Sequence, residues 1–286
     1  MKEALISAAS FLKWRLVPVR HVGRLRHINA GNIFVQYNPK TPQGRELEEK
    51  GYATGPVLEP TLLQELQDLY LPRIAEIEGR PKHAPFVNLV RAEDFTPENP
   101  LMRLAFSPEI LDIALDFYGG HCRIDKLQVL YSFPVEDGEG LKESQKWHLD
   151  YNDSRSYHAI TYLNDVLGDE DGPFGYINKA DSRRVGRGPV IRRIEDSQLR
   201  KELGDGEVQV FYGKAGSTVL VDPSNCYHYG SRCKNARTAI FATFSSDKPY
   251  IKAQPIMRAN RERLLSAAKS LRPDLEPQVL EKLMHI

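Results

Sequence analysis

Trp147-His148-Leu149-Asp150 is the stretch that decides the fold, together with His228 far downstream. Side chains alternate between the two faces of a β-strand, so His148 and Asp150 are expected on one face and Leu149 on the other. A histidine from a distant strand, His228, would complete a set of two imidazoles and one carboxylate. Such a set occupies one face of a metal and leaves three positions open, the arrangement of non-haem Fe(II) oxygenases.

A His-x-Asp triplet alone is common by chance, and its ordinary interpretation is a polar pair at the surface. The flanking segments favour the metal site, because they are β-branched and aromatic runs typical of buried strands. The upstream run is followed by a loop at 134–140 that contains proline and glycine. Strands are expected at 126–133, 157–163, 172–177, 215–222 and 237–244, with His228 in the segment between the last two.

The order and spacing of these runs resemble the phytanoyl-CoA dioxygenase-like family of Fe(II)/2-oxoglutarate oxygenases. The resemblance covers about Gly51 to Phe244 and includes Lys50-Gly51-Tyr52-Ala53-Thr54-Gly55-Pro56-Val57-Leu58, followed by a helix. It implies a mainly β fold with flanking helices, whose core is a double-stranded β-helix of the jelly-roll or cupin type. It also implies that His148, Asp150 and His228 bind the iron.

The same resemblance implies a site for the cosubstrate. Arg237 would hold the C5 carboxylate of 2-oxoglutarate, which a guanidinium binds with two parallel hydrogen bonds. Arg237 follows His228 more closely than is usual in the family, so a shortened turn is implied and Arg232 is the alternative. Ser231 would touch the C5 end. Tyr131 would donate a hydrogen bond to the cosubstrate or, equally, be a packed aromatic of the barrel.

The implied reaction is a hydroxylation. Two neutral imidazoles and one carboxylate leave an Fe(II) site cationic enough to bind a dianionic 2-oxoacid. With O2, the family converts 2-oxoglutarate to succinate and CO2 while it hydroxylates a C–H bond. Family halogenases have a small residue at the carboxylate position, which leaves room for chloride, so Asp150 favours hydroxylation. A zinc hydrolase on the same ligands is disfavoured because no general base is evident beside them.

Composition limits the other classes of protein. The 286 residues carry a formal net charge of +1, and no stacking motif or recognition helix is found, so nucleic acid is not an expected partner. Three cysteines without C-x-x-C spacing predict neither a disulfide framework nor a zinc ribbon, and a reducing cytoplasm fits best. No apolar run is long enough to cross a bilayer. A single oxygenase domain is expected at 31–250, with a basic segment at 1–30 and a helical extension at 251–286.

Two segments are strongly basic. Residues 1–26 contain six basic residues and one acidic residue, a net charge of +5, and Lys2 to Val17 predict an amphipathic helix. This helix would dock on the domain's own core or lie on an anionic membrane surface, at the inner face of the membrane. Residues 178–201 contain eight basic and three acidic residues, again +5. They would form a solvated loop and helix, or a rim that attracts an anionic substrate.

Together, the basic segments suggest an acidic substrate linked to a membrane. A sugar acid or phosphate-bearing group on a lipid carrier would use both of them. The resemblance extends to hydroxylases of Kdo, the inner-core sugar of lipopolysaccharide and lipid A. Alternatives are a soluble hydroxylase of small molecules or secondary metabolites, and a barrel that binds ligands without turnover. The intact metal ligands and Arg237 argue against the non-catalytic barrel.

Helices are expected around the barrel. One covers Glu59 to Ile77 and should be divided at Pro72, which cannot donate a backbone hydrogen bond. Another begins at Ser107-Pro108-Glu109 and ends before Gly119-Gly120. A strand is expected at 31–37 and two short C-terminal helices at 258–270 and 276–284. Of the remaining histidines, His158 is expected at an ordinary polar position or, as the alternative, in the lining of the pocket. His83 and His121 lack partners at ligand spacing.

Overall fold

The computed structural model describes residues 16, 37–81, 84–136, 138–185, 193–247 and 249–286. The helix expected at Lys2 to Val17, apart from Leu16, lies outside the described residues, as does the strand expected at 31–37, apart from Tyr37. His83, Arg187 and Arg192 lie outside them as well.

The larger sheet has six antiparallel strands in the order β1-β7-β4-β9-β3-β2. Every residue of β4 is buried, because both faces of this central strand are covered. The long strands β3 and β9 form the most extensive pairing and run along each other almost from end to end. The bounds are β1 Tyr52–Val57, β2 Phe86–Asn88, β3 Arg123–Ser132, β4 Tyr157–Tyr162, β7 Ser217–Val221 and β9 Arg237–Ser245.

The smaller sheet has three antiparallel strands in the order β6-β5-β8. Its strands are β6 Gln209–Phe211, β5 Phe174–Tyr176 and β8 His228–Tyr229. Between the two sheets lies an apolar cluster to which both contribute, including Ile160 and Val219 from the larger sheet and Phe174 and Tyr176 from the smaller one. The chain therefore forms two opposed antiparallel sheets, as the sequence predicted.

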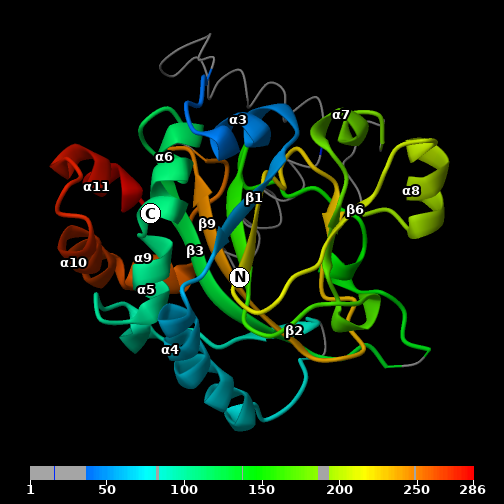
Figure 1. Cartoon of the computed structure of the whole chain (residues 1–286), viewed down its shortest axis with the longest axis horizontal. Coiled ribbons are helices and arrows are strands. Elements are labelled where there is room, and N and C mark those ends of the chain that lie inside the picture. The colour runs from blue at the N-terminus through cyan, green and yellow to red at the C-terminus, as the bar shows by residue number, and fades with distance from the viewer. Residues whose placement is uncertain (1–15, 17–36, 82–83, 137, 186–192, 248) are drawn as a thin grey trace.

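Helices cover the other face of the larger sheet, where Leu127, Val129 and Ala242 join the main apolar cluster. Figure 1 shows α5, α6 and α9 to α11 on that side, while β6 and α8 lie on the other. The C-terminal helices pack into this cluster through Met257 and Leu264. The helices are α3 Pro42–Glu49, α4 Pro60–Tyr70, α5 Pro100–Ala105, α6 Ile113–Phe117, α7 Lys179–Ser182, α8 Asp196–Leu203, α9 Pro255–Ala259, α10 Arg261–Leu271 and α11 Pro277–Leu283.

Proline and glycine interrupt or end the helices at the positions that the sequence predicts. α4 ends at Tyr70 and continues only as a 3-10 helix at Leu71–Glu76, because Pro72 cannot extend the α-helical ladder. The helix after Ser107 begins as a π-helical turn, Pro108–Asp112, and the Ser107 side chain makes no capping hydrogen bond. Gly119 and Gly120 then end α6 with positive φ angles of 72° and 108°.

Candidate metal centre

The backbone around His148 differs from the regular strand that the sequence predicted. Trp147 and His148 form isolated antiparallel bridges to Ile194 and His228. The amide of His148 donates to the carbonyl of His228, and the amide of His228 donates back, each at 3.0 Å. The amide of Asp150 donates to Pro223 O at 2.9 Å. These few hydrogen bonds hold the His-x-Asp segment against the chain that leads into β8.

Three side chains meet at this point. The Nε2 atoms of His148 and His228 lie 3.8 and 4.0 Å from Asp150 Oδ1. One ligand atom from each of the three lies within 4.8 Å of the others. Two imidazole nitrogens and a carboxylate oxygen gathered in this way would hold a divalent metal ion. The structure therefore brings together the three residues predicted as ligands.

Hydrogen bonds to the backbone fix which ring nitrogen of each histidine is free. Nδ1 of His148 lies 2.8 Å from Lys146 O, and Nδ1 of His228 lies 3.0 Å from Cys226 O. A carbonyl oxygen only accepts, so each Nδ1 carries the proton and donates it. Both Nε2 atoms are then left with a free lone pair, as metal ligation requires.

The protonation states also suit a metal. Burial lowers the pKa of His148 to about 3 and lowers the pKa of His228 as well, so both imidazoles are neutral near pH 7. Burial acts to raise the pKa of Asp150, but the neighbouring histidines and Lys126 lower it below its ordinary value. The site thus presents two neutral imidazoles and one carboxylate, the forms that bind divalent metals.

His158 lies beside these candidate ligands, which favours the alternative of a pocket-lining residue over an ordinary polar position. Its Nε2 is 3.7 Å from Asp150 Oδ2, whereas Nε2 of each of the other two histidines lies nearest to Oδ1. The side chain is buried, and its Nε2 has no hydrogen-bond partner among the described residues. Burial lowers its pKa to about 3. In the sequence, the only indication that His158 lies near the site is that its strand closely follows His148 and Asp150.

Arg237 and Arg232 have very different surroundings. Arg237 is only 2% exposed, and its guanidinium donates to Gly172 O and, at 3.1 Å, to Ser231 Oγ. Its Nε–H has no partner among the described residues. Ser231 Oγ also lies 3.0 Å from Ser132 Oγ. The buried guanidinium with unused donor capacity suits a carboxylate, and Ser231 adjoins it as the sequence suggested.

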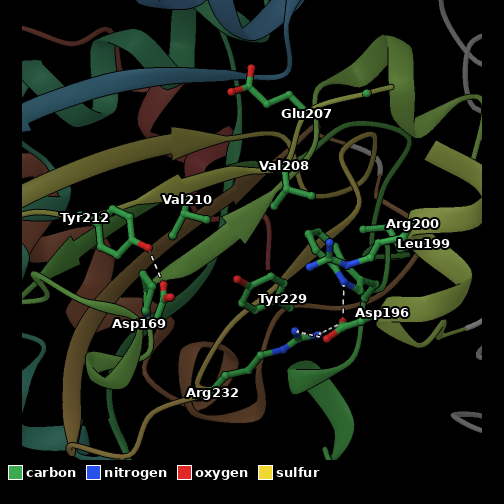
Figure 2. A pocket seen from close by; sticks show the side chains of 13 residues that line it. Asp169, Asp196, Leu199, Arg200, Glu207, Val208, Val210, Tyr212, Tyr229 and Arg232 are labelled. Atoms are coloured by element: carbon green, nitrogen blue, oxygen red, sulfur yellow. Dashed lines mark hydrogen bonds and ion pairs between the residues drawn. The ribbon is translucent and has the colours of Figure 1, made fainter. Parts of the chain in front are cut away.

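Arg232 instead lies in a cavity of about 630 Å³ that Trp147 and Tyr229 help to line (Figure 2). Its guanidinium stacks 3.7 Å from the ring centre of Tyr229 and forms ion pairs with Asp196 at 2.9–3.0 Å. Trp147 and Tyr229 are the chain neighbours of His148 and His228, and successive side chains of extended backbone point to opposite faces. This cavity is therefore on the outer side of the smaller sheet, behind the ligands.

Tyr131 does not face the site, which corrects its proposed role toward the cosubstrate. It pairs with Thr238 of β9 and shares its face of β3 with Leu127 and Val129, which pack under the helices. Its ring makes an edge contact with Phe133 at 5.0 Å. Tyr131 is thus the packed aromatic that was the alternative interpretation.

Half of the described basic residues at 178–201 form ion pairs, namely Lys179, Arg184 and Arg193. Arg184 forms an ion pair with Asp181 at 3.1 Å, and Arg193 forms one with Glu143 at 2.7 Å. Arg200 lines the outer cavity with Arg232. Among the described residues no helix has the length and apolar character to cross a bilayer.

The fold resembles solved structures, although no protein-family model and no curated protein sequence matches the chain. One similar structure is EctD from S. alaskensis with 2-oxoglutarate and 5-hydroxyectoine, with a TM-score of 0.53 and 17% identity over 74% of this chain and 78% of that one. Another is the non-heme alpha ketoglutarate dependent epimerase SnoN from nogalamycin biosynthesis, with a TM-score of 0.52 and 15% identity over 75% and 82%. The chain shares the double-stranded β-helix fold of these enzymes.

Proposed function

We propose that the protein is an Fe(II)/2-oxoglutarate-dependent dioxygenase that hydroxylates an unactivated C–H bond. One observation carries the proposal: two histidine Nε2 atoms and the Asp150 carboxylate converge between the two sheets, with the free ring nitrogens fixed by backbone carbonyls. The arrangement suits Fe(II), which binds two histidines and a carboxylate on one face and keeps the opposite positions open.

The residues present fit both groups. His148, Asp150 and His228 would hold the iron, and Arg237 would bind the C5 carboxylate of 2-oxoglutarate through donors that the protein leaves unused. Ser231 holds the Arg237 guanidinium in place. When bound, iron and 2-oxoglutarate supply the oxidising power that, with O2, inserts oxygen into a C–H bond and releases succinate and CO2. The protein contributes orientation and a site screened from water.

Succinate formation tests this proposal. Protein incubated in air with Fe(II), 2-oxoglutarate and fractions of a cell extract should release succinate, and one component should gain the mass of a single oxygen atom. The His228→Ala variant should release none, because it lacks one of only three ligands. A wild type that forms no more succinate than this variant would favour the barrel that binds ligands without turnover.

For the substrate, we propose an acidic sugar or lipid-linked glycan, with Kdo of lipid A or the lipopolysaccharide inner core as the example. The net charge of +5 at residues 178–201 and again at residues 1–26 supports an anionic substrate near an anionic surface. The alternative is a soluble small-molecule hydroxylase; the related SnoN fold was solved in complex with Fe3+, alpha ketoglutarate and nogalamycin RO. Succinate release with Kdo-bearing lipid A but not with the lipid lacking Kdo would support the acidic sugar as the substrate.

Peripheral membrane contact through residues 1–26 is part of the same proposal. Full-length protein should float with liposomes that contain anionic lipid at low salt, and a chain without these residues should remain at the bottom of the gradient. Equal recovery of the two proteins would remove the membrane from the account and leave a soluble hydroxylase.

A further inference from the structure

Three strands place one row of polar side chains on the inner face of the larger sheet. Thr243 of β9 pairs directly with His158 of β4 on one side and with Lys126 of β3 on the other. Residues paired across an antiparallel sheet point to the same face. His158 lies against Asp150, so the row begins beside the candidate metal ligands.

The row has unused hydrogen-bonding capacity. Thr243 is 1% exposed, and its Oγ1 has no partner among the described residues. Lys126 is only half-buried, and no carboxylate oxygen of the described residues lies within 4.0 Å of its ammonium. A buried hydroxyl in a folded protein normally has a partner, so Thr243 Oγ1 indicates a missing ligand. The neighbouring Lys126 supplies a positive charge on the same face of the sheet.

Lys126 is the cation of the row. His158 lies at the other end of the row and 3.7 Å from Asp150 Oδ2, so Lys126 is on the face of the sheet that bears the candidate metal ligands. Asp125, the chain neighbour of Lys126, is already paired with Arg123. The ammonium of Lys126 can therefore pair with an anionic ligand between the sheets.

The row and Arg237 lie toward opposite ends of β9. Thr243 and Arg237 are six residues apart (243 − 237), which corresponds to about 20 Å of strand. Gly230 and Ser231, just beyond the His228 ligand, adjoin the Arg237 guanidinium. The ligand on that side is the C5 end of the cosubstrate, so an anion held by the row lies on the Asp150 side of the centre.

We propose that Lys126 and Thr243 form an anion subsite for a carboxylate of the substrate. The inference rests on the proposed function and narrows it to an acidic substrate. Lys126 donates from its ammonium, and Thr243 donates from its hydroxyl. Because the row begins beside Asp150, the substrate carboxylate lies on the Asp150 side of the centre.

A paramagnetic relaxation experiment tests the subsite before the substrate is known. The protein is loaded with Co(II) and saturating 2-oxoglutarate without O2, and the methyl protons of added acetate or acetamide are followed by NMR. Acetate should relax faster near Co(II), whereas neutral acetamide should not. Lys126→Met should weaken acetate binding roughly tenfold, the change expected on losing a hydrogen bond to a charged group. Thr243→Val should weaken it less, and Lys269→Met, on the exposed surface of α10, not at all.

Three results would overturn the subsite: no acceleration for the wild type, equal acceleration in Lys126→Met, or displacement of acetate by further 2-oxoglutarate. The last two would place acetate on the metal or in the cosubstrate site. Binding of Co(II) and 2-oxoglutarate is measured by calorimetry before acetate is added, which also shows that each variant is folded. Failure at that step would be a failure of the proposed function, and the inference would fall with it.

Discussion

At the scale of single residues, two backbone carbonyls determine what the metal ligands can do. By accepting from Nδ1 of His148 and His228, Lys146 O and Cys226 O leave the Nε2 atoms free. The sequence predicts which residues are the candidate ligands, because a His-x-Asp triplet and a later histidine occur among strand signals. It does not predict the tautomers, which depend on carbonyl directions that follow from the local path of the chain.

Arg237 should dominate binding of the cosubstrate. Arg237→Met should weaken 2-oxoglutarate binding by about 100-fold, roughly 3 kcal/mol, because one carboxylate would then be buried without its cation. Arg232→Met is the matched control and should change the affinity little, since Arg232 pairs with Asp196 on the outer side of the smaller sheet. Calorimetry with the metal-loaded variants measures both. A larger loss of 2-oxoglutarate affinity for Arg232→Met than for Arg237→Met would show that Arg232 binds the cosubstrate instead.

His158 should position Asp150. His158→Phe should weaken Co(II) binding about 10- to 100-fold, as is typical when a residue that supports a metal ligand is lost. His158→Gln keeps a donor toward Asp150 Oδ2 and should recover part of the affinity. Competition with a chelator gives both values. Equal affinities for His158→Phe and wild type would reduce His158 to a packing residue.

At the scale of elements, the site depends on very short ones. β8 contains only His228 and Tyr229, and its ladder to β5 contains two residue pairs. The sequence predicts the long strands well because β-branched and aromatic runs are a local signal. It does not predict that His158 faces Asp150 or that Tyr131 faces the helices, because the register of one strand against another is set by contacts far apart in the chain.

Gly51 immediately precedes β1 and lies beside Cys226, which adjoins the metal centre. Its φ is +86°, and a Cβ there would lie 2.2 Å from Cys226 Sγ, in the residue whose carbonyl orients His228. Gly51→Ala should therefore destabilise the fold by about 1–3 kcal/mol in urea unfolding and also weaken metal binding. Gly79→Ala is the control, because no atom lies within 4 Å of its added Cβ. Equal stabilities of the two variants would contradict this role of Gly51.

At the scale of the whole molecule, the fold is three layers: helices, the larger sheet and the smaller sheet, with the ligands between the two sheets. The layers follow from the sequence, since strand runs and amphipathic helices occur in the expected order. The sequence does not predict which side chains line the space between the sheets, because residues from β3, β4, β8 and β9 line it together.

Metal should stabilise the folded protein as a whole, because the three ligands come together only in the native state. At metal concentrations about 100 times Kd, the gain is about 2.7 kcal/mol, which corresponds to a rise in Tm of roughly 5–10 °C. A chelator should reverse it. Asp150→Ala should show no rise; an equal rise in this variant would mean that the metal binds elsewhere.

The most direct test of the central claim is the visible spectrum of the protein without O2. Addition of Fe(II) followed by 2-oxoglutarate should produce a weak metal-to-ligand charge-transfer band in the wild type, because the 2-oxoacid chelates iron held by His148, Asp150 and His228. His228→Ala should give no band. A wild type without the band, or a His228→Ala variant with the same band, would contradict the claim that these three side chains form an Fe(II)/2-oxoglutarate centre.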